Sequence, residues 1–159
     1  MTDDLTRRSL EFIGTCSDPK KLRQIEKNAR REGNATVARA AQLRLYSVLP
    51  AAKPGTLEYD VWQSIYALEG TLTIEKGKTM RLSRTRQKIA RDSELKTVSD
   101  LVMGKPSAGF QMLIDREMAG LTFEAVALRH PKRFSDEVLR AAEDRLAKAG
   151  IDPSKFRSR

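Results

Sequence analysis

Five apolar side chains recur at helical spacing between residues 57 and 72, and this run narrows the range of folds open to the chain. Their steps of four, four, three and four place them on one face of an α-helix. Thr56 precedes the run and can cap it. The alternating residues 71–74 fit a short strand as well, but we prefer a helix that continues to about Ile74. The stripe consists of Leu57, Val61, Ile65, Leu68 and Leu72.

Helix start and stop signals divide the first 50 residues into three helices. The first runs from about Leu5 to Gly14. A second begins where Asp18 can cap and Pro19 suits the first helical position, and Gly33 ends it. Asn34 can cap a third helix that runs to about Leu49. The short joint favours an antiparallel hairpin, so residues 1–50 are predicted to form a three-helix unit.

Residues 51–56 (AAKPGT) indicate a linker, because Pro54 and Gly55 both break regular structure. Beyond it, residues 56–150 are predicted to form a bundle of about five helices, including segments near 83–92, 94–103, 107–119, 122–131 and 135–149. Ser83 or Thr85 is expected to cap the first of these segments. The tail, residues 151–159, has no apolar period and is expected to fray. The predicted fold is therefore an all-α, multi-helix bundle.

Positive charge is concentrated in one segment. The chain has 30 Lys and Arg against 21 Asp and Glu, a net charge of +9. Residues 76–91, here called the basic tract, contain seven of these bases and no carboxylate. A charge block of one sign attracts polyanions, and phosphate backbones release counterions on binding it. We therefore expect a nucleic-acid partner, with DNA favoured over RNA. The candidate contacts are Lys76, Lys78, Arg81, Ser83, Arg84, Thr85, Arg86, Gln87, Lys88 and Arg91.

The surroundings of the basic tract have the layout of a helix-turn-helix, although the connection is longer than the tight turn of that motif. Arg84 and Lys88 share one helix face, while Arg86 lies on another. Arginine and glutamine can read base edges, lysines neutralise phosphates, and hydroxyls at a helix start can bind phosphate. The sequence thus predicts a small double-stranded DNA-binding regulator or accessory factor. A homodimer would be natural for such a layout, but no heptad seam requires one.

Two other interpretations of the charge remain open. The basic tract could be a solvated face paired with nearby carboxylates, namely Glu69, Glu75, Asp92 and Glu94. The N-terminal helices could instead form an interaction module that docks an acidic protein. A second basic cluster on the predicted helix after Pro19 is either a second phosphate contact or, as we prefer, a solubilising face. It consists of Lys20, Arg23, Lys27, Arg30 and Arg31, with Lys21 beside them.

Enzyme chemistry is difficult to build from this chain. One cysteine, Cys16, and one histidine, His130, cannot form a zinc cluster of the usual spacing. No phosphate-binding loop or hydrolase motif occurs. A metal-dependent nuclease, our third interpretation, would need carboxylates such as Glu58, Asp60, Glu69 and Glu75 close to Lys76 or Lys78, and their spacing is not the usual one. We therefore expect no catalytic residue, metal or cofactor.

We expect neither a secretory signal nor a membrane-spanning segment. The first residues are polar and lack the apolar core of a secretory signal. The sequence contains no run of 18 apolar residues, the length needed to span a bilayer. We expect a cytoplasmic protein with no membrane partner.

Overall fold

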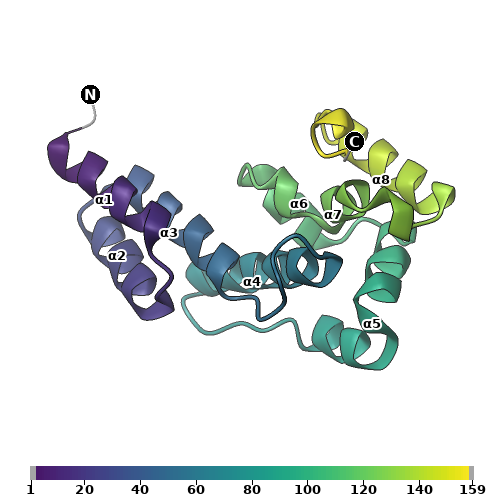
Figure 1. The fold of residues 1–159 in the computed structure, drawn as a ribbon, viewed down its shortest axis with the longest axis horizontal. Coiled ribbons are helices and arrows are strands. Elements are labelled where there is room, and N and C mark those ends of the chain that lie inside the picture. Colours follow the sequence, from purple (N-terminus) through teal and green to yellow (C-terminus); the bar gives the residue numbers. More distant parts are fainter. Residues whose placement is uncertain (1–2, 158–159) are drawn as a thin grey trace. The chain divides into compact units, whose positions relative to one another are not determined.

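The computed structural model describes residues 3–157, which form eight α-helices and three short 3-10 helices and contain no strand (Figure 1). The all-α prediction is confirmed. The described residues divide into two compact units, with the boundary between Ala51 and Ala52. This boundary lies at the start of the Pro-Gly segment, residues 51–56.

The first unit contains α1 (Asp4–Thr15), α2 (Pro19–Arg31) and α3 (Ala35–Val48). The Asp18 side chain accepts a hydrogen bond from the Lys20 amide, and Gly33 adopts a left-handed φ of 76° after α2. Asn34 caps α3 by accepting from the Val37 amide. The hairpin of α2 and α3 packs with α1 around one core. That core includes Ile13, Cys16, Leu22, Ala29, Val37, Ala38, Ala41 and Leu45.

The second unit begins with α4 (Leu57–Lys76), a helix of 20 residues. The Thr56 side chain accepts from the Tyr59 amide, and Gly77 ends the helix at a φ of 71°. Residues 71–74 are helical, so the strand alternative is wrong. The predicted stripe faces the core, where Leu57, Val61 and Ile65 are fully buried.

A sharp break at Ser93 divides α5 (Ser83–Met103), as the two predicted segments require. Ser93 has φ 83° and ψ 166°, and Figure 1 shows α5 as two arms that meet at an angle. The predicted cap by Ser83 or Thr85 is wrong: Leu82 occupies the cap position, and no side-chain hydrogen bond caps the helix.

Three further helices complete the second unit, and side-chain caps start each of them: α6 (Ala108–Asp115), α7 (Phe123–Arg129) and α8 (Asp136–Lys148). α6 is shorter than predicted, because Glu117 turns the chain with a φ of 57° and a 3-10 helix, Ala119–Leu121, follows. Another 3-10 helix, Pro131–Arg133, joins α7 to α8.

The predicted frayed tail, residues 151–159, is wrong for its described part. Asp152 caps a 3-10 helix, Pro153–Lys155. Ile151 and Phe156 pack against the core, and the guanidinium carbon of Arg129 lies 5.6 Å from the centroid of the Phe156 ring. These two apolar side chains hold the tail on the core, although they form no helical period in the sequence. Residues 158–159 lie outside the described part of the chain.

Candidate nucleic-acid interface

The basic tract covers the end of α4, the connection 77–82 and the first arm of α5. Two backbone amides tie this connection back to α4. The Met80 amide donates to Thr73 Oγ1 at 2.9 Å, and the Leu82 amide donates to Glu69 Oε2 at 2.8 Å. The connection therefore has a fixed path, although it contains no regular structure.

Four cations around this connection are exposed: Lys76, Lys78, Arg81 and Arg84. Within residues 3–157, no carboxylate forms an ion pair with any of them. No carboxylate occurs between positions 76 and 84. We call these four residues the connector cations. They form a patch of positive charge on the second unit that no ion pair of the described residues neutralises, although the charge of Arg81 does help to lower the pKa of Glu69.

Arg86 has a different environment. Its Nε and Nη2 atoms donate to Glu69 Oε2 and Oε1, each at 2.7 Å. Its guanidinium carbon lies 5.1 Å from the centroid of the Trp62 ring and 5.6 Å from that of Tyr66. Only 23% of the Arg86 side chain and 10% of the Glu69 side chain are exposed. Planar, bidentate pairing on an aromatic face is a geometry that guanidinium suits. Arg86 therefore attaches the start of α5 to α4.

Glu69 takes the place of the predicted cap. Burial raises the pKa of its carboxyl, but the hydrogen bonds from Arg86 and from the Leu82 amide outweigh burial, and the pKa lies below its ordinary value. The ionised Glu69 holds both the backbone at Leu82 and the side chain of Arg86. The start of α5 is thus fixed by a residue of α4 rather than by Ser83 or Thr85.

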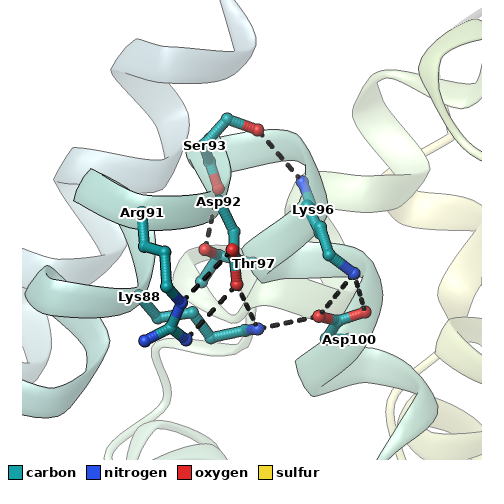
Figure 2. A network of polar contacts seen from close by, with 7 residues as sticks. All are labelled: Lys88, Arg91, Asp92, Ser93, Lys96, Thr97 and Asp100. Atoms are coloured by element: carbon teal, nitrogen blue, oxygen red, sulfur yellow. Dashed lines mark hydrogen bonds and ion pairs between the residues drawn. The ribbon is translucent and has the colours of Figure 1, made fainter.

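Lys88 bridges the two arms of α5, as Figure 2 shows. Its Nζ lies 2.9 Å from Asp92 Oδ2 and 2.7 Å from Asp100 Oδ2. Asp100 also forms an ion pair with Lys96, and Asp92 forms one with Arg91. The hydrogen bonds that Lys88 donates to Asp100 and Asp92 raise the pKa of Lys88 and lower the pKa of each carboxyl. Lys88 thus links the two arms by its charge.

The break at Ser93 makes this bridge possible. Its carbonyl accepts from Thr97 Oγ1 at 2.7 Å, and its Oγ accepts from the Lys96 amide at 3.5 Å (Figure 2). The left-handed φ of Ser93 turns the second arm so that Asp100, twelve residues along the chain, reaches Lys88. A backbone conformation that serine rarely adopts is therefore held by contacts with Lys96 and Thr97 of the second arm.

The expected carboxylate partners are partly correct. Glu69 and Asp92 do pair with the tract, whereas Glu75 pairs with Arg116 instead. Asp100 was missed, because its approach depends on the angle between the two arms. Of the polar candidates, Ser83 and Gln87 are exposed and Thr85 is half-buried. Arg91 is exposed but pairs with Asp92.

The second basic cluster lies on α2. Arg30 pairs with Glu26 and donates to Gln42, and Arg31 donates to Asn28. The other four cations of this helix are exposed, and none forms an ion pair within the described residues. They are Lys20, Lys21, Arg23 and Lys27.

The carboxylates considered for a nuclease are each paired with a different basic side chain. Glu58 lies 4.0 Å from Arg133, and Asp60 Oδ2 lies 2.7 Å from His130 Nε2. Glu69 pairs with Arg86, and Glu75 with Arg116. Throughout residues 3–157, no group of three or more His, Cys, Asp or Glu side chains is placed to hold a metal ion.

Searches against family models, curated proteins and solved structures give no match for this chain. In the described part, none of the helices combines the length and the apolar character needed to cross a bilayer.

Proposed function

We propose that this protein binds nucleic acid, with double-stranded DNA as the favoured partner, and acts as a regulator or accessory factor. The connector cations supply the main phosphate contacts. The observation that carries the proposal is that they form no ion pair within residues 3–157, next to a tract whose other bases are paired. Charges that the fold does not neutralise are the ones that a polyanion can use.

The paired bases make a smaller contribution in this proposal. Arg86 is committed to Glu69, and Lys88 to two aspartates. Their use for DNA would require these ion pairs to break. Base reading in this proposal falls to Arg84 and Gln87, which are exposed on the first arm of α5.

Salt dependence of binding tests the proposal. Fluorescence anisotropy with a short labelled DNA duplex, repeated with RNA of the same sequence, gives log K at salt concentrations between about 50 and 200 mM. One variant replaces all four connector cations by glutamine. Its matched control replaces Lys20, Lys21, Arg23 and Lys27 by glutamine, which removes the same charge from the first unit.

Four phosphate contacts correspond to a slope of about −3.6 in log K against log salt. The connector variant should lose this component, which amounts to a factor of about 150 over a fourfold change of salt. The control should keep it. Equal losses in both variants would show that only net charge matters, and a wild-type protein that does not bind either nucleic acid would refute the proposal.

An interaction module for an acidic protein is the second candidate. The first unit exposes the four cations of α2 that form no ion pair within the described residues and, on α1, the apolar side chains of Leu5 (71% exposed) and Phe12 (48%). Such a mixture suits a protein partner better than a phosphate backbone. In this case the α2 variant would lose partner binding, and the connector variant would not.

A further inference from the structure

The second unit contains an apolar pocket that the proposed function does not use. It has a volume of about 420 Å³ and is walled by α4, α5, α6, α7 and α8. Its apolar lining includes Leu68, Leu72, Phe110, Leu113 and Phe123. Pockets that hold small organic molecules have volumes of about 300–1,000 Å³ and mostly apolar walls with a few polar groups. This pocket has the size and lining of such a site.

Two of the charged side chains that line the pocket pair with each other. Arg145 Nη1 donates to Glu124 Oε2 at 2.7 Å, and the two side chains are 12% and 5% exposed. Arg145 also donates to the carbonyls of Leu101 and Gly104. Burial raises the pKa of the Glu124 carboxyl, and the hydrogen bond from Arg145 opposes that effect. These two charges neutralise each other inside the wall.

Lys105 is the remaining charged residue of the lining, and it is exposed. No ion pair within residues 3–157 engages it. The pocket therefore joins an apolar interior to one uncompensated cation at its solvent side. A ligand that complements both parts has an apolar body and an anionic group.

We propose that this pocket binds a small organic anion with an apolar body, of the class of a medium-chain carboxylic acid. The apolar chain occupies the interior, and the carboxylate contacts Lys105. Burial of the chain supplies most of the affinity, and the ion pair at the exposed rim adds a smaller share.

The pocket also touches the start of α5. Leu82 and Thr85 line it, and the Leu82 amide is one of the two that tie the connection to α4. A ligand in the pocket therefore contacts the segment that carries the connector cations. We infer that occupancy changes nucleic-acid affinity. This second step rests on the proposed function, whereas ligand binding itself does not.

Titration calorimetry with decanoate, and with decan-1-ol as its uncharged counterpart, tests the site on the full chain without nucleic acid. Lys105→Gln alters only an exposed side chain and should weaken decanoate about two- to fivefold while leaving decanol unchanged. Lys20→Gln, which removes one charge from the first unit, should leave both unchanged. Leu72→Trp fills part of the pocket and should abolish both.

Three results would overturn the site: no saturable binding, decanoate binding that survives Leu72→Trp in a folded protein, or equal weakening by Lys105→Gln and Lys20→Gln. The link to α5 is tested by adding decanoate to the anisotropy assay, where any change must vanish in Leu72→Trp. Unchanged nucleic-acid affinity at saturating decanoate would overturn the link alone. Absence of nucleic-acid binding would refute the proposed function and leave the calorimetric result standing.

Discussion

Replacement of Arg86 should lower the stability of the protein rather than its affinity for nucleic acid, although Arg86 lies in the middle of the basic tract. Removing one partner of a fully buried ion pair costs about 3–5 kcal/mol, whereas an exposed pair contributes about 0–1 kcal/mol. The Glu69–Arg86 pair lies between these cases, with exposures of 10% and 23%. We expect Arg86→Met to lower the free energy of unfolding by about 2 kcal/mol, with up to about 1 kcal/mol more from the lost contacts with Trp62 and Tyr66.

The more conservative replacement is equally informative. Arg86→Lys keeps the charge but loses the bidentate geometry, so it should still cost about 1–2 kcal/mol. Arg84 is the matched control, because it lies two residues earlier on the same arm, is exposed and has no ion pair within the described residues. Arg84→Met and Arg84→Lys should each change stability by less than about 0.5 kcal/mol.

Urea unfolding followed by tryptophan fluorescence measures these effects. Trp62 is the single tryptophan of the chain and lies on α4, so its emission follows the second unit. A double-mutant cycle with Glu69→Gln should give a coupling of about 2 kcal/mol between the two side chains. In the salt titration, Arg84→Met should flatten the slope by about 0.9 and Arg86→Met should not. The opposite pattern, a stable Arg86→Met protein with a flattened slope, would refute the assignment of a structural role.

Three further perturbations address stability. Ser93→Gly should raise the free energy of unfolding by about 0.5–1 kcal/mol, because glycine accepts the left-handed φ of 83°. Ser99→Gly, within the second arm, should lower the free energy of unfolding by about as much. Urea unfolding that shows both variants destabilised would contradict this account of the break. The contribution of Glu69 should depend on pH: since its pKa is lowered in the folded protein, the contribution is fully present above its ordinary value of 4.5 and is lost as pH falls below it. The stability gap between wild type and Glu69→Gln should therefore narrow in acid, and a gap that stays constant from neutral pH down to the acid transition would argue against it. Phe156→Ala should lower the melting temperature through a loss of about 2 kcal/mol of stability, because the ring packs on the core. Lys155→Ala is the control and should leave the melting temperature unchanged. Equal melting temperatures for the two variants would mean that the tail does not stabilise the second unit.

Local signals in the sequence account for most of the correctly predicted fold. Asp18, Asn34 and Thr56 each cap a helix as expected, because a cap involves residues only two or three positions apart. The start of α5 could not be predicted in this way. Its anchor, Glu69, lies thirteen residues before Leu82 and reaches it only after α4 and α5 pack.

The candidate interface shows the same difference between local signals and contacts that form only after the helices pack. A charge count locates the basic tract, since it needs no structure. It cannot separate Arg84 from Arg86, two positions apart, because their difference lies in Trp62, Tyr66 and Glu69 on another helix. An arginine that follows an aromatic-rich helix with an acidic residue on it is the signal that could have indicated a stacked, paired side chain.

The two amide anchors of the connection have a consequence for the entropy of binding. A disordered basic tail must lose backbone freedom when it meets a phosphate chain, at roughly 1–2 kcal/mol for each residue that becomes fixed. Residues 77–82 lose much of that freedom when the second unit folds, because Met80 and Leu82 are held against α4. A ligand that docks on this segment meets a prearranged surface, so less of its contact energy is spent on ordering the chain.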